Sequence, residues 1–127
     1  MSPKMIGMGA GTVWYFAYGS NMSAARMRER VGEVGGWEER IPGVLEEWRL
    51  VFNKVASRNP REGFANIEPS AGERVEGCLY RLSESVLERL DRYEGMKSGH
   101  FKRMQVTVIR KDTGESVITY THMAWPE

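Results

Sequence analysis

The segment WYFAYGSNM, Trp14 to Met22, constrains the fold more than any other part of the chain. Val13 to Tyr18 is a run of β-branched and aromatic residues, which is typical of a buried strand. Gly19 ends the run, and the polar residues after it are alternative N-caps for a helix over SAARMRERVG, residues 23–32. The segment therefore predicts a strand, a polar turn and a helix in direct succession.

The rest of the chain predicts further strands and one further helix. Strands are expected over residues 40–54 (two lengths of extended chain with a bend near Glu46 and Glu47), 64–69, 73–82, 101–110 and 116–125, with a turn at AGE, residues 71–73. The clearest helix covers Glu84 to Tyr93, with Ser83 as its cap and Gly95 as its end. About six strands and two helices without βαβ alternation predict an α+β fold.

Length and composition limit the number of domains and the kinds of partner. The 127 residues predict a mobile lead-in over residues 1–12 and a single domain over residues 13–127. With 18 basic and 17 acidic residues, the formal net charge of +1 argues against a dedicated nucleic-acid binder. Cys78 is the only cysteine, which excludes an intramolecular disulfide and a Cys-rich metal site. The N-terminus has no secretory or membrane-spanning pattern, so we expect a cytoplasmic protein without a membrane partner.

The turn Gly19-Ser20-Asn21 is the first candidate binding site. A strand that leads into a helix start presents unpaired backbone N–H groups beside the positive end of the helix dipole, which suits a carboxylate or an oxyanion. Glycine allows a ligand close to the backbone because it has no Cβ. The alternative is an ordinary cap that closes a turn, and the local sequence alone favours this alternative.

Glu94 is the candidate acid/base. A glutamate at the C-terminal end of a helix meets the negative end of the dipole, which raises a carboxyl pKa if the group is also shielded. The alternative is a solvated residue at a helix end. Asp91 lies three positions earlier on roughly the same helical face, where it either couples to Glu94 or caps a neighbouring turn.

Other polar residues give weaker indications. His100 and His122 lie on different expected strands without a third ligand, so no zinc site is predicted. Ser20 lacks the glycine pattern of a nucleophile elbow. Arg58 and Arg61 lie in an expected exposed loop, either solvated or facing a substrate carboxylate.

Several of these segments occur together in one order that resembles the γ-glutamylcyclotransferase-like superfamily, which includes the AIG2-like proteins. The matching segments, over about residues 13–124, are YFAYGSNM, GFANIEPS, VEGCLYRLSESVLERLDRYEG, KSGHFKRMQVTV and VITYTHM. The resemblance implies a small, mostly antiparallel, partly closed β-barrel with flanking helices and a cavity at one mouth. It also implies that Tyr18, Gly19, Ser20 and Asn21 bind the substrate and that Glu94 is the catalytic acid/base.

The implied activity is that of an acyltransferase that cleaves a γ-glutamyl amide and releases 5-oxoproline and an amine, without a metal or organic cofactor. The alternative is a non-catalytic module on the same fold that binds a small carboxylate. Phe101 stands where related sequences often carry a tyrosine, and the chain ends at Glu127 whereas longer members continue. With Phe101, any contact made there by a phenolic hydroxyl is absent. The C-terminal segments of the longer members would be expected to shape the pocket beyond the γ-amide, so the released amine is left open, and the sequence does not indicate the oligomeric state.

Overall fold

The computed structural model describes residues 11–19, 27, 39–53, 64–98 and 101–124. Their elements, in chain order, are β1 (Thr12–Ala17), β2 (Glu39–Asn53), β3 (Phe64–Ser83), α3 (Glu84–Ser98), β4 (Phe101–Arg110) and β5 (Ser116–Ala124). The expected helix over residues 23–32 and most of the lead-in fall outside these ranges. Met27, the one described residue of that helix, is helical and fully buried.

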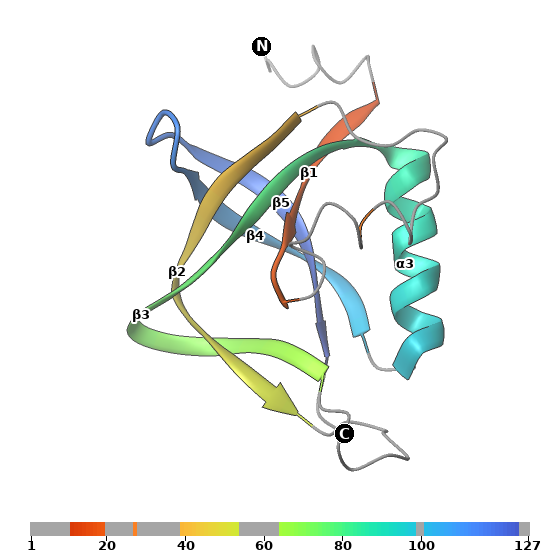
Figure 1. Ribbon diagram of the computed structural model, residues 1–127, viewed down its shortest axis with the longest axis horizontal. Helices are drawn as coiled ribbons and strands as arrows, with labels where there is room; N and C mark the ends of the chain where they lie inside the picture. Colours follow the sequence, from red (N-terminus) through yellow and green to blue (C-terminus); the bar gives the residue numbers. More distant parts are fainter. Residues whose placement is uncertain (1–10, 20–26, 28–38, 54–63, 99–100, 125–127) are drawn as a thin grey trace.

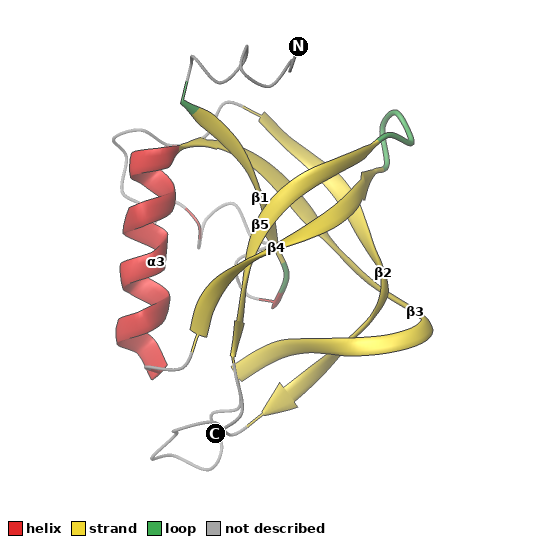
Figure 2. Ribbon diagram, turned by 180° about the vertical axis from the view of Figure 1, so that it is seen from behind, coloured by secondary structure: helices red, strands yellow, loops and turns green. Residues whose placement is uncertain are grey.

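The strands form a closed barrel in the order β1-β3-β2-β4-β5 (Figure 1). Four of the neighbouring pairs are antiparallel, and β1 meets β5 in parallel at Tyr15 and Tyr120. The helix α3 lies along the outside of the barrel, as the view from behind also shows (Figure 2). This architecture confirms the expected α+β fold with a mostly antiparallel barrel and a flanking helix.

The bend near Glu47 is confirmed, but the strands on either side of it are continuous. The register between β2 and β3 shifts between Glu46 and Trp48, and Glu47 has a φ of 71°, so the bend is a β-bulge. Opposite the bulge, β3 runs on through Pro69, where the sequence predicts a strand end and a turn. The predicted strand end is wrong because a bulge tolerates a proline without a donor and β3 continues to Ser83. The predicted turn falls within residues 70–73, which have no partner in the register and include Gly72 with a φ of 84°, so the chain bends there within the strand.

The end predicted for the helix at Gly95 is also wrong. Ser83 is the cap, since its Oγ accepts a hydrogen bond from the backbone N–H of Val86 at 3.2 Å. From there α3 continues through Gly95 to Ser98. An interior glycine costs a helix only about 1 kcal/mol relative to alanine, which is too little to end it by itself. Glu94 is therefore an interior residue of the helix, not its last.

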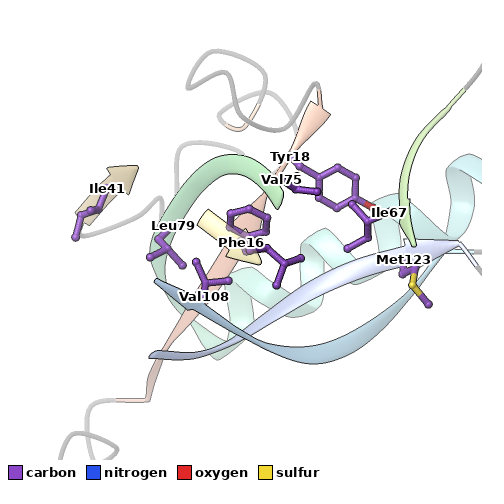
Figure 3. Close-up of a cluster of buried hydrophobic side chains, with 9 residues drawn as sticks. Phe16, Tyr18, Ile41, Ile67, Val75, Leu79, Val108 and Met123 are labelled. Carbon is purple, nitrogen blue, oxygen red and sulfur yellow. The ribbon is translucent and has the colours of Figure 1, made fainter. Parts of the chain in front are cut away.

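Two clusters of buried side chains lie on the two sides of β1. Phe16 belongs to the cluster within the barrel, shown in Figure 3. Tyr15 and Ala17 belong to the cluster between the barrel and α3, together with Leu87 and Leu90 of the helix. Successive side chains of a strand point to opposite faces, so a strand buried on both faces must be apolar throughout. This explains the unbroken apolar run that precedes the polar turn.

Candidate functional site

The sequence predicts five site residues, and the structure describes them to different extents. Tyr18 and Gly19 follow β1 directly and are described in full. Glu94 lies within α3, but its side chain is outside the described part of the structure. Ser20 and Asn21 lie outside the described residues altogether. The mutual geometry of the five therefore remains a prediction.

Tyr18 attaches the start of the turn to β5. Its side chain is buried, and its hydroxyl donates a hydrogen bond of 2.6 Å to the backbone carbonyl of His122. Figure 3 shows the ring beside Ile67 within the cluster in the barrel. The hydroxyl and the ring of Tyr18 thus hold the chain in place at the point where the predicted binding turn begins.

Gly19 occupies a position that accepts only glycine without rearrangement. Its φ is 65°, in the left-handed region that side chains disfavour. A Cβ built on Gly19 would lie 2.8 Å from the Cβ of Ala65, closer than two such atoms approach in proteins. Gly19, the first residue of the turn, is therefore packed directly against β3, and the glycine is required by both its backbone angle and this close approach.

His122 of β5 connects Tyr18, at the start of the turn, to the helix, a role that no sequence pattern predicts. The residue is only 3% exposed. Its Nδ1 lies 2.9 Å from the hydroxyl of Tyr15, and its Nε2 lies 2.7 Å from Oδ1 of Asp91 on α3. An ionised carboxylate can only accept, so Nε2 carries a proton, and in the neutral ring Nδ1 accepts from Tyr15. Asp91 therefore pairs with a residue of β5, which neither of the two sequence-based interpretations, a cap or a partner of Glu94, includes.

Arg103 of β4 holds the other side of the Asp91 carboxylate. Its terminal nitrogen lies 2.5 Å from Oδ2 of Asp91, and its Nε lies 3.2 Å from the same oxygen. Hydrogen bonding to Asp91 is the main reason why the pKa of Arg103 is raised above its ordinary value. The guanidinium also lies over the ring of Tyr120, 4.9 Å from its centroid. Asp91 thus joins α3 to both β4 and β5.

The alternation of side chains along β5 is the one sequence pattern that bears on the contacts of His122, and it acts only within the strand. One face of β5 carries the buried side chains of Thr119, Thr121 and Met123. His122 lies on the opposite face, which is turned toward α3, and there it pairs with Asp91. The sequence predicts alternation along β5 but not which residue of α3 meets it. Asp91 and His122 are 31 positions apart.

The remaining candidates contribute no described site. Ser20, Arg58, Arg61 and His100 lie outside the described residues. Within the described ranges, no three His, Cys, Asp or Glu side chains are grouped to hold a metal ion. No helix in the same ranges is long and apolar enough to cross a membrane. Cys78 is half-buried and packs against the cluster between the barrel and α3.

Comparisons with known proteins agree with this fold. The family model described as Gamma-glutamyl cyclotransferase, AIG2-like matches residues 15–126. A Gamma-glutamylcyclotransferase from Bos taurus is 31% identical over 104 residues, which make up 80% of this chain and 54% of that protein. The chain thus spans about half the length of the curated relatives it matches.

Solved structures resemble the barrel as a whole. A structure of a human protein called uncharacterized protein loc79017 is 26% identical and superposes with a TM-score of 0.77, over 91% of this chain and 68% of that one. Another, called Gamma-glutamyl cyclotransferase, is 26% identical with a TM-score of 0.76, over 90% of this chain and 67% of that one. Because the family model covers most of the chain and a relative at 31% identity agrees with it, this protein belongs to the Gamma-glutamyl cyclotransferase, AIG2-like family.

Proposed function

We propose that this chain catalyses γ-glutamyl cyclotransfer, in which the α-amine of a γ-glutamyl amide attacks its own γ-carbonyl and releases 5-oxoproline and an amine. The observation that supports this proposal is the position of His122. Its carbonyl holds Tyr18, at the start of the predicted binding turn, and its ring holds Asp91, one turn before Glu94. The two segments that the family resemblance assigns to binding and catalysis are thus attached to one residue of β5.

The reaction needs no nucleophile from the protein. The substrate nitrogen forms a bond to the γ-carbon, the bond from that carbon to the departing nitrogen breaks, and a five-membered lactam results. No water is consumed and no oxidation state changes. Catalysis therefore depends on holding the α-amine close to the γ-carbonyl, because orientation alone supplies several kcal/mol of the barrier, up to roughly 10.

In this proposal, Glu94 moves the protons. Its carboxylate accepts a proton from the substrate α-ammonium, which makes the amine nucleophilic, and the resulting acid protonates the departing nitrogen. Backbone N–H groups of the turn that starts at Gly19, with Ser20 and Asn21, bind the α-carboxylate or the developing oxyanion. A carboxylate that accepts and then returns a proton fits a reaction in which both nitrogens change their protonation.

The proposal is tested by assaying 5-oxoproline release from a panel of γ-glutamyl dipeptides and γ-glutamyl amines. The wild-type chain is compared with Glu94→Gln, which keeps the shape of the side chain but removes its basicity. Glu88→Gln is the matched control, because Glu88 is an exposed residue of the same helix. We expect product from wild type and from Glu88→Gln, and at least a hundredfold lower rate from Glu94→Gln.

Two results would contradict the proposal in different ways. Full activity in Glu94→Gln would exclude the assigned acid/base. A ligand-induced rise in the melting temperature without product from any substrate would replace the enzyme by the alternative, a module that binds a small carboxylate.

A further inference from the structure

We propose that His122 is a positioning residue for the γ-glutamyl cyclotransfer reaction, because it fixes α3, and with it Glu94, relative to the turn that begins at Tyr18. This inference rests on the proposed function. In this proposal, His122 itself does not touch the substrate. It acts through the segments that it holds.

Three hydrogen bonds meet on this one residue. The backbone carbonyl accepts from the hydroxyl of Tyr18, Nδ1 pairs with the hydroxyl of Tyr15, and Nε2 pairs with the carboxylate of Asp91. The Tyr15 and His122 rings also contact each other, with centroids 5.4 Å apart and planes inclined by 57°. β1, β5 and α3 are therefore joined at a single buried point.

The contact of His122 with Asp91 differs from the apolar contacts of α3 in being directional. Val86, Leu87 and Leu90 pack against the barrel through apolar surface, which favours burial but not a particular rotation of the helix. A hydrogen bond between Nε2 and a carboxylate, by contrast, has a narrow range of distance and angle. Asp91 thus determines how far the helix is rotated and where it lies along its axis.

Glu94 is placed by the same constraint. It lies three residues after Asp91, which makes the two side chains neighbours on the helix surface and separates their Cα atoms by about 4.5 Å along the axis. A small rotation of α3 would therefore move the Glu94 carboxylate away from the nitrogens that it must reach. Misplacement by about 1 Å costs a catalytic group roughly a hundredfold in rate.

Arg103 and His122 have different roles in this arrangement. The Arg103 side chain is 35% exposed, so its ion pair with Asp91 is partly screened by solvent. The His122 side chain is 4% exposed, and its bond to Asp91 is shielded. The buried partner therefore dominates the orientation of Asp91, and the exposed arginine balances the charge of the carboxylate.

The experiment separates the contact of His122 with Asp91 from its contact with Tyr15. Changing His122 alone would remove both contacts, so both variants are built in a Tyr15→Phe background, in which the contact with Tyr15 is already absent. In that background, His122→Leu removes the donor, and His122→Gln keeps an N–H group at about the position of Nε2. The control is Arg110→Gln, which breaks a comparable arginine–aspartate fork, to Asp112, at the far end of β4.

Rates of 5-oxoproline release are divided by the folded fraction of each variant, measured by urea denaturation. Relative to Tyr15→Phe, we expect His122→Leu to lower kcat between tenfold and a hundredfold, with KM changed less than about twofold. We expect His122→Gln to recover most of the rate and Arg110→Gln to match wild type. A merely structural role would reduce the folded fraction but leave kcat per folded molecule unchanged.

Three results would overturn the inference, and they are distinguishable. An unchanged kcat in the His122→Leu variant would show that the donor does not position the site, while the proposed function stood. A His122→Gln variant as slow as the leucine variant would show that the bond to Asp91 is not the cause of the loss. Absence of product from wild type on every substrate would refute the proposed function, and the inference would fall with it.

Discussion

Replacing Gly19 with alanine tests whether the predicted binding turn is built on a close approach between two backbones. The residue has a φ of 65°, and an added Cβ would lie 2.8 Å from the Cβ of Ala65 on β3. Two separate costs therefore act at this position. One is the strain of a left-handed alanine, and the other is the collision with a strand that is held in the barrel.

The two costs are separable because the chain offers a glycine that has only the first. Gly11 has a φ of 67°, and a Cβ added there would meet nothing within 4 Å. Left-handed strain costs about 1–2 kcal/mol, of which about 0.4–1 kcal/mol is recovered because alanine restricts the unfolded chain. Overpacking adds about 1–3 kcal/mol. We expect a loss of roughly 1 kcal/mol for Gly11→Ala and roughly 2–4 kcal/mol for Gly19→Ala.

The assay is the free energy of unfolding from urea denaturation, with the slope of the transition compared between variants. A double-mutant cycle with Ala65→Gly then isolates the collision. Removing the Cβ of Ala65 should restore about 1–3 kcal/mol to Gly19→Ala and nothing to Gly11→Ala. Equal losses at the two glycines, or no recovery in the double variant, would refute the conclusion that the turn is packed against β3.

Two further predictions concern the barrel and the turn between β4 and β5. The buried hydroxyl of Thr119 forms no hydrogen bond with any described residue, whereas that of Thr121 donates to the carbonyl of Phe16 at 2.8 Å. Thr119→Val should therefore raise the free energy of unfolding by about 1 kcal/mol, and Thr121→Val should lower it by about 1–2 kcal/mol. Losses of equal size in the two variants would contradict this prediction. The Arg110 guanidinium holds the pKa of Asp112 below its ordinary value, so the stability from this contact is present above the unfolded pKa of about 4 and is lost as the pH falls through the folded value. In an NMR titration, Arg110→Gln should therefore raise the pKa of Asp112, and an unchanged value would contradict the assigned cause.

Much of the fold follows from patterns that act over short distances. The strand at the start of the domain, the cap at Ser83 and the two strands around the turn at residues 111–115 all lie within a residue or so of their expected positions. Each depends on side-chain alternation, a capping hydroxyl or a turn glycine, and these are properties of neighbouring residues. Such features are predictable because tertiary packing reinforces the local preference.

The wrong boundaries occur where tertiary structure overrides a local signal. Pro69 is a strand breaker in most contexts, but opposite the bulge at Glu47 it stays within β3. Gly95 often ends a helix, but α3 continues past it to Ser98. The preference of Gly95 against the helix interior is worth only about 1 kcal/mol, and the bulge removes the conflict between Pro69 and the strand. Packing against the rest of the chain therefore decides both outcomes.

The candidate site likewise has local features that the sequence predicts and long-range contacts that it does not. The turn after β1 and the glutamate in LDRYEG are visible as motifs, because each is a short run of residues. The contacts of His122 are not, since they join residues that are 107, 104 and 31 positions apart. Only closure of the barrel brings these partners together, with β5 beside β1 and α3 against both.

The same closure explains why so polar a turn follows so apolar a strand. β1 is buried on both faces, by the barrel on one side and α3 on the other, and this requires apolar side chains up to its last residue. Tyr18 then satisfies its hydroxyl on the carbonyl of His122, and Gly19 turns the chain sharply against Ala65. A strand held on both faces gives the turn a fixed starting point at Tyr18 and Gly19, and in the proposed function the backbone N–H groups of this turn bind the ligand. The apolar run and the polar turn therefore have complementary roles in the proposed function, in which a rigid strand positions the predicted binding turn.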